Sequence, residues 1–345
     1  MLSVALVLAA ASPFENYQEQ SETVCVGKAD HAFAEPDSWS AAGHRFVVRG
    51  ARAEVKREGE SAAAAKGEAK LGLLAAVKDF SPETQENLKT FIAAFKRAGV
   101  SGVIIGGDSA YGVDDQDTTL TEMFTFLGAQ EVPVYVVIGN SESRSSFNRA
   151  LLAAFRKHKN VINLDLVRRV DGDGFVLVSL PGYYDKRYIH ESAGCHYKPD
   201  DVQAVLGLAK GAAAPVVMVS HGPPRQQGKF ALDATSDGHN VGDPELASVM
   251  TQAKIPFGVF GHILESGGRA TDLSGKKQVK PNSAAPALYV NPGPAFADPW
   301  QLNSGVVSRG MAAIITIRAG KGEWQSITPS SARAKGRRPA SKPWR

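Results

Sequence analysis

Short apolar runs alternate with amphipathic segments from residue 71 onward. The runs LGLLAAV, VSGVIIG, VPVYVVIG and FVLVSLPG begin at residues 71, 100, 132 and 175, and segments with helical spacing lie between them. Runs without polar alternation are typical of strands buried on both faces, and strands separated by helices predict a layered α/β fold. Three later runs, APVVMVSHGPP, IPFGVFGH and ALYVNPG, predict further strands separated by shorter or irregular pieces.

The first helix of this pattern has clear boundaries. Ser81 is a good N-cap and is followed by Pro, which fits the first helical position. Four apolar side chains between Leu88 and Phe95 lie on one helical face, and Gly99 follows as a stop. The sequence therefore predicts a helix over residues 82–98.

The N-terminus carries a short, mostly apolar run. Residues 2–11 end in Ala-Ala-Ala, but no Lys or Arg precedes them, and the run is too short to span a bilayer. We interpret residues 1–20 as a signal segment for export to the periplasm or cell envelope; a frayed helix in a cytoplasmic protein is the alternative. The two cysteines, Cys25 and Cys195, either form a disulfide in an oxidising compartment or stay reduced in the cytosol.

Composition divides the chain into a main domain with an extension at each end. Residues 21–67 form an N-terminal extension that ends in a linker or solvated helix, because the stretch 51–70 is rich in Ala, Glu and Lys without an apolar stripe. Residues 68–327 form the main domain, and residues 328–345 a basic, disordered tail. The formal charge of +4 falls to −2 without the six basic residues after Trp324. The charge therefore does not indicate nucleic-acid binding, and no transmembrane segment is predicted.

Polar side chains follow several predicted strands at the point where each strand ends. They are Asp79, Asp108, Asn140, His221 and His262. The carboxyl ends of strands form the usual ligand-binding edge of an open α/β sheet. Because carboxylate, amide and imidazole groups suit a divalent transition metal, we expect these side chains to form a metal site.

Several motifs around these residues belong to one known pattern. They are SHGPP at 220–224, GHNVGD at 238–243, FGHILE at 260–265 and YVNPGPA at 289–295. In this order the chain resembles the calcineurin-like metallophosphoesterase family over residues 71–294. The resemblance implies a layered α-β-β-α sandwich, with two mixed sheets flanked by helices and a two-metal centre. It also implies hydrolysis of phosphomonoesters or phosphodiesters.

The resemblance implies that one of the two metal sites keeps its ligands. The bridging Asp, the Asn, the strand-end His and the first His of Gly-His-x-His match Asp108, Asn140, His221 and His262. These residues imply a site for one divalent ion, Mn, Zn or Fe. A vestigial site without metal is the alternative.

The other metal site has lost its histidines. The family's first strand ends in Asp-x-His, where Asp79 keeps the Asp and Ser81 replaces the His; in a second register, Lys78 takes the place of the His. The second His of Gly-His-x-His is Leu264. The His that assists the leaving group has become Ser141. The resemblance thus implies a reduced metal site.

Four side chains are candidates to supply the missing chemistry. Lys78 offers a positive charge, and Arg225 offers paired N–H donors to a phosphate. Glu142 and His239 are candidates for proton transfer. The histidines outside the motifs are expected at the surface or in satisfied core positions: His158, His190 and His196.

The leading hypothesis is metal-dependent hydrolysis of a small phosphorylated substrate or a phosphodiester. The alternative is a catalytically inactive protein that keeps the fold for binding or assembly at the cell envelope, because fold does not fix function. A minor alternative is a serine hydrolase, since Ser141 follows a strand as a nucleophile elbow does. However, Ser143 stands where that motif requires Gly.

Overall fold

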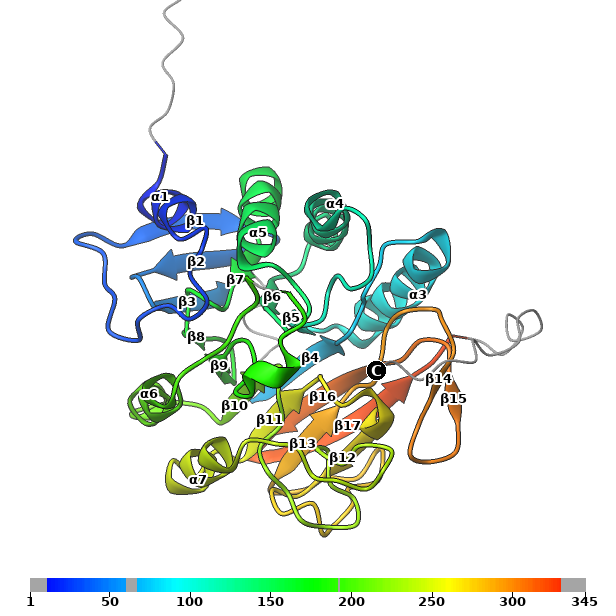
Figure 1. Cartoon of the computed structure of the whole chain (residues 1–345). Helices are drawn as coiled ribbons and strands as arrows, with labels where there is room; N and C mark the ends of the chain where they lie inside the picture. Colours follow the sequence, from blue (N-terminus) through cyan, green and yellow to red (C-terminus); the bar gives the residue numbers. More distant parts are fainter. Residues whose placement is uncertain (1–10, 60–66, 192, 330–345) are drawn as a thin grey trace, which may run out of the picture.

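The computed structural model describes residues 11–59, 67–191 and 193–329, which form two large sheets packed face to face (Figure 1). The nine-stranded sheet contains, in spatial order, β1 (Asp37–Ala41), β2 (His44–Val48), β3 (Arg52–Arg57), β8 (Arg169–Asp171), β9 (Val176–Leu180), β10 (Val216–Ser220), β11 (Phe257–Phe260), β13 (Leu288–Asn291) and β12 (Arg269–Thr271). The six-stranded sheet contains β17 (Lys321–Ile327), β16 (Ala312–Arg318), β4 (Glu68–Leu74), β5 (Gly102–Gly106), β6 (Val134–Val137) and β7 (Val161–Asn163). A small hairpin joins β14 (Trp300–Gln301) and β15 (Val307–Ser308).

Helices surround the two sheets (Figure 1). They are α1 (Pro13–Gln20), α3 (Pro82–Ala98), α4 (Gln116–Gly128), α5 (Arg144–His158), α6 (Pro199–Ala209) and α7 (Pro244–Gln252), with 3-10 turns η1 (Lys186–Tyr188) and η2 (Leu264–Ser266). One apolar core lies between the sheets, a second joins α3, α4 and α5 to the six-stranded sheet, and a third joins α6 and α7 to the nine-stranded sheet. The predicted α-β-β-α sandwich is confirmed.

The centre of each sheet is parallel. Strands β4 to β7 run in one direction in the six-stranded sheet, and β9, β10, β11 and β13 do so in the other. All seven apolar runs noted in the sequence supply one of these strands. The carboxyl ends of β5 and β6 and those of β10 and β11 are followed by the polar residues of the candidate site.

Helix α3 has the predicted boundaries. It spans Pro82–Ala98, the Ser81 hydroxyl accepts a hydrogen bond from the Thr84 N–H at 3.3 Å, and Gly99 ends the helix with φ of +67°. Glycine adopts this left-handed conformation without the steric cost of a Cβ. The apolar face, from Leu88 to Phe95, is buried against the six-stranded sheet.

The stretch 51–70 departs from the prediction of a linker or solvated helix. Residues 52–57 form β3, which pairs with β2 and β8, and residues 68–70 open β4; residues 60–66 lie outside the described residues. Ala53 and Val55 point into the core at the spacing of two that defines a strand. The linker prediction was wrong there because it relied on the high Ala, Glu and Lys content. The alternation that marks a strand consists of only two small apolar residues, Ala53 and Val55.

The N-terminal extension is part of the fold. Strands β1 to β3 extend the nine-stranded sheet, and Phe14 of α1 is fully buried beside Trp39 and Phe155. Within the predicted signal segment, residues 1–10 lie outside the described residues, whereas 13–20 form α1. Most of the predicted disordered tail, residues 330–345, also lies outside them.

A disulfide joins the N-terminal extension to the main domain. Cys25 and Cys195 are bonded, with 5.0 Å between their Cα atoms. Cys195 lies in the loop between β9 and α6, so the bond fixes that loop to the segment after α1. Among the described residues, the helices are too short or too polar to cross a membrane.

Candidate metal centre and active site

Four of the predicted metal ligands meet between the two sheets. Asp108 and Asn140 follow β5 and β6, while His221 and His262 follow β10 and β11. Ligand atoms of Asp108, His221 and His262 lie within 4.8 Å of one another, and the Asn140 side-chain oxygen is 2.6 Å from His221 Nε2 and 2.9 Å from His262 Nδ1. The sequence expectation placed these four side chains together, and the structure does so.

Tight turns aim these side chains into the site. Asp108 has φ of +54° and His262 has φ of +50°. Both lie in the left-handed region of backbone conformation, which residues other than glycine rarely adopt. Gly107 precedes Asp108 with φ of +85°, and a Cβ there would lie 2.5 Å from Nδ1 of His221. Only glycine fits that close approach, so the Gly-Asp pair is required by the packing of the site. Strained backbone of this kind concentrates at functional sites.

The hydrogen bonds behind the ligands orient their lone pairs toward one point. Nδ1 of His221 donates to the carbonyl of Gly106 at 2.9 Å, which leaves Nε2 with its lone pair facing the site. The Asn140 amide nitrogen donates to the Tyr188 carbonyl at 2.5 Å, so its oxygen also faces inward. Nε2 of His221 lies 3.2 Å from a carboxylate oxygen of Asp108. Imidazole nitrogen, amide oxygen and carboxylate oxygen gathered at such distances are a donor set that suits a divalent transition metal, so the residues present fit a bound ion.

The charge states of these groups suit the same purpose. Burial, with the neighbouring His221, lowers the pKa of His262 to about 3, so its ring is neutral near pH 7. Burial alone would raise the pKa of Asp108, but His221 and Lys78 outweigh it and hold that pKa below its usual value. A neutral imidazole and an ionised carboxylate are the forms that ligate metals.

A small apolar cluster lies next to the ligand group. Ala76, Leu264 and Phe296 form a small buried cluster next to the site. Asp79 does not join the ligand group: its carboxylate accepts a hydrogen bond from the Ser81 N–H at 2.9 Å, at the start of α3. The arrangement favours the second register, in which Ala76 and Lys78 stand at the Asp and His of Asp-x-His.

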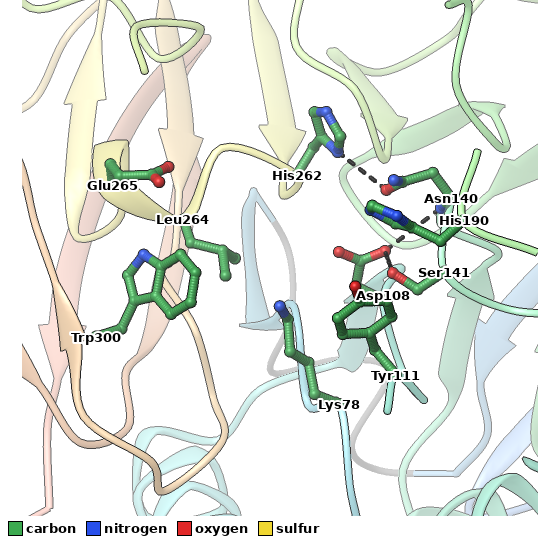
Figure 2. A pocket seen from close by; sticks show the side chains of 10 residues that line it. All are labelled: Lys78, Asp108, Tyr111, Asn140, Ser141, His190, His262, Leu264, Glu265 and Trp300. Carbon is green, nitrogen blue, oxygen red and sulfur yellow. Dashed lines mark hydrogen bonds between the residues drawn. The ribbon is translucent and has the colours of Figure 1, made fainter. Parts of the chain in front are cut away.

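Lys78 points into the cavity that Asp108 and Leu264 also line (Figure 2). Its ammonium lies 5.0 Å from the ring centre of Tyr111, 5.4 Å from that of Phe296 and 5.2 Å from that of Trp300. Aromatic faces attract cations at these distances. Burial lowers the pKa of Lys78, while the charges of Asp108 and Glu265 oppose that shift. A side-chain cation thus stands in the same cavity as Asp108.

The turn after β6 has a structural role that the sequence did not indicate. The Ser141 hydroxyl donates to Asp108 at 2.7 Å and is buried, so it orients a ligand, which does not favour the serine-hydrolase alternative. Glu142 is fully buried and accepts hydrogen bonds from the N–H groups of Ser109 and Gly139. Burial, together with the charge of Asp108, raises the pKa of Glu142 to about 8. Glu142 braces the two turns and is not among the residues that line the cavity.

Two other candidates lie away from the cavity. The Arg225 side chain donates to the carbonyl of Gly242 at 2.8 Å and lies 3.7 Å from Asp233. The His239 side chain is 78% exposed and is paired with Asp237 at 2.9 Å. Neither residue lines the cavity, because the segment after SHGPP turns away from the strand ends and packs on residues 233–243.

The cavity has a volume of about 140 Å³ and includes residues that the sequence did not single out (Figure 2). Tyr111, His190, Glu265 and Trp300 line it together with Lys78 and the metal-ligand candidates. The sequence placed His190 at the surface or in the core, not at the site. It comes from the loop between β9 and α6, which carries no motif, so no sequence signal indicated its position here.

The four-layer sandwich and the ligand cluster at its strand ends define a metallophosphoesterase-like protein. The family model for calcineurin-like phosphoesterases matches residues 81–266, which is more than half of the chain. The chain therefore belongs to the calcineurin-like phosphoesterase family. The family binds divalent metals and acts on phosphate esters. No curated protein matches the sequence.

Solved structures are similar to this chain at low sequence identity. The protein TT1561 of Thermus thermophilus has a TM-score of 0.50 and 13% identity, covering 74% of this chain and 98% of that one. A dimetal phosphatase from Danio rerio has a TM-score of 0.45 and 17% identity, covering 76% and 99%. GAP50, described as the anchor in the inner membrane complex of Plasmodium, has a TM-score of 0.47 and 14% identity, covering 78% and 87%. Identities this low bear on the fold alone.

Proposed function

We propose that this protein hydrolyses a phosphomonoester or phosphodiester with one bound divalent metal ion. The observation that carries the proposal is the convergence of four side chains that can ligate a metal, two of which, His221 and Asn140, are oriented by hydrogen bonds to backbone carbonyls. Asp108, Asn140, His221 and His262 would hold the ion. A donor set of imidazole, carboxylate and amide oxygen suits Mn, Zn or Fe.

Each wall of the cavity has a role in this reaction. A divalent ion held there supplies positive charge that polarises a phosphoryl oxygen and makes a water molecule more acidic. Lys78 contributes a second positive charge, since its ammonium lies in the same cavity beside Asp108. The Tyr111 and Trp300 rings lie on either side of the Lys78 ammonium and keep it in place (Figure 2). A charge-assisted hydrogen bond from Lys78 to the phosphoryl group takes over part of the work of a second metal.

A second candidate is a non-catalytic protein of the cell envelope that uses the fold for binding or assembly. One observation favours it: the contact of Ala76 with Leu264 and Phe296 fills half of the metal centre with apolar groups. A protein with one metal and no turnover would match this candidate. Activity of the purified protein separates the two.

The test measures metal content and hydrolysis on the same preparation. We expect about one Mn, Zn or Fe per chain by elemental analysis, and hydrolysis of p-nitrophenyl phosphate or bis(p-nitrophenyl) phosphate. His221→Ala should lose both metal and activity, whereas His239→Ala is the matched control because that histidine is exposed and outside the cavity. Metal without turnover would support the non-catalytic candidate; two metals per chain would contradict the ligand assignment.

We propose export as the setting for this activity. The Cys25–Cys195 disulfide supports it, because structural disulfides persist mainly in oxidising compartments. Fractionation of the native host, followed by thiol alkylation of the protein, tests the proposal. Recovery in the cytoplasm with two free thiols would contradict it.

A further inference from the structure

The loop between β9 and α6 brings His190 to the catalytic cavity. Its side chain lines the same cavity as Asp108, Asn140 and His262. The His190 ring lies 4.9 Å from the ring of Tyr111, another residue that lines the cavity. Because His190 is exposed, it stands on the solvent side of the cavity.

Several contacts fix the position of this loop. The His190 N–H donates to the Asn140 carbonyl at 3.0 Å, and the Asn140 side chain donates to the Tyr188 carbonyl at 2.5 Å. The Arg144 side chain donates to the Ala193 carbonyl at 2.7 Å. Five residues after His190, the disulfide anchors the loop at Cys195. The loop is thus tied directly to the turn that supplies a metal-ligand candidate.

We propose that His190 donates a hydrogen bond to the leaving-group oxygen, a role that rests on the proposed phosphoester hydrolysis. In the family a His directly after the Asn ligand assists the leaving group, and here that position is Ser141. The Ser141 hydroxyl is directed at Asp108 and does not face a leaving group. The backbone N–H of His190 is hydrogen-bonded to Asn140, the residue before Ser141. This bond brings the His190 imidazole to the same turn from another part of the chain.

The chemical step balances with water as the only co-reactant. The water oxygen forms the new bond to phosphorus, and the bond from phosphorus to the leaving oxygen breaks with its electron pair on that oxygen. A hydrogen bond from the His190 ring stabilises this developing charge, and one of the protons of the water ends on the leaving oxygen. A neutral imidazole carries one N–H, so the hydrogen bond does not depend on the charge of the ring.

One rival donor lies on the opposite wall. Glu265 follows Leu264 and lines the cavity beside Trp300, away from the Asn140 turn (Figure 2). Burial raises the pKa of Glu265, which favours its protonated form. Replacing each donor separately therefore decides which wall serves the leaving group.

The experiment compares two substrates on the metal-loaded full chain. p-Nitrophenyl phosphate has a leaving group that departs without help, whereas phenyl phosphate needs stabilisation of its oxygen. For His190→Ala we expect kcat/KM to fall about 100-fold or more on phenyl phosphate and less than about 10-fold on p-nitrophenyl phosphate. His190→Gln keeps an N–H donor and should recover part of the lost activity on phenyl phosphate. Glu265→Gln should lower kcat/KM by the same factor on both substrates. His239→Ala should change kcat/KM on neither.

The outcomes separate this proposal from the proposed function. A wild-type protein that cleaves neither ester contradicts the hydrolase itself. A wild-type protein that cleaves both, with equal losses in His190→Ala on the two substrates, overturns the role of His190. If Glu265→Gln instead loses activity selectively on phenyl phosphate, Glu265 is the donor to the leaving-group oxygen, and this result also overturns the role of His190. Because His190 is exposed, its variants should keep the unfolding midpoint of the wild type, and His190→Gln serves if the alanine variant does not.

Discussion

Removing the disulfide should destabilise the protein by an amount set by the length of chain it closes. The two cysteines are 170 residues apart, and loop-closure entropy for such a span gives about 5 kcal/mol at 25 °C. Residual structure in the unfolded chain reduces this value, so we expect a loss of about 2–5 kcal/mol in the free energy of unfolding. Both residues should be replaced together, because a single change leaves a free thiol.

The measurement is urea-induced unfolding of Cys25→Ala/Cys195→Ala beside the oxidised and the reduced wild type. The reduced wild type is the matched control, because it lacks the bond but keeps both side chains. It should unfold at the same lower midpoint as the double variant. If both match the oxidised wild type within about 1 kcal/mol, the entropy argument is wrong for this chain. A large loss in the double variant alone would assign the effect to packing around Cys195, which is fully buried.

Three further changes probe the site and the core. Lys78→Met should lower kcat/KM about 10- to 100-fold by losing a charge-assisted contact; an unchanged kcat/KM would exclude its catalytic role. Gly107→Ala should weaken metal affinity about 10-fold or more by equilibrium dialysis, since its Cβ would meet His221, whereas Gly112→Ala has open space and should bind metal normally. Burial raises the pKa of Asp165, so the folded state keeps a proton that the unfolded state loses, and stability falls as pH rises above about 4. Asp165→Asn should flatten that fall in urea midpoints measured up to about pH 7, and a parallel slope would contradict this assignment.

Local signals in the sequence were sufficient for the regular elements of the main domain. Helix α3 was predicted between its two caps because Ser81 and Gly99 act within one turn of the chain. The stretch 52–57 could not be recognised, because Ala53 and Val55 become a strand only through pairing with β2 and β8, which lie elsewhere in the chain. Tertiary pairing outweighs weak local propensity in such segments.

The candidate site likewise contains residues that local sequence predicts and residues that only tertiary contacts bring into place. Asp108, Asn140, His221 and His262 follow apolar runs directly, and parallel strands bring such positions to one edge. His190 and Trp300 reach the cavity through a long loop and a small hairpin, whose paths depend on contacts distant in sequence. The prediction that Arg225 contacts the substrate has no support from the structure, for the converse reason. Arg225 lies next to a motif in sequence, but its side chain packs on Gly242 and Asp233.

The changes in the family's second metal site compensate one another in physical terms. Removing a metal from beside Asp108 leaves a buried carboxylate with less positive charge, and Lys78 supplies a cation in the same cavity. Losing two ligand positions to Ala76 and Leu264 removes polar groups that would otherwise be buried without a partner, and these two side chains pack together with Phe296. Simple decay of a site would leave unpaired polar groups or an uncompensated charge. The balance of charge and packing is what the proposed centre requires, in which one metal ion and one lysine would share the work of two metals.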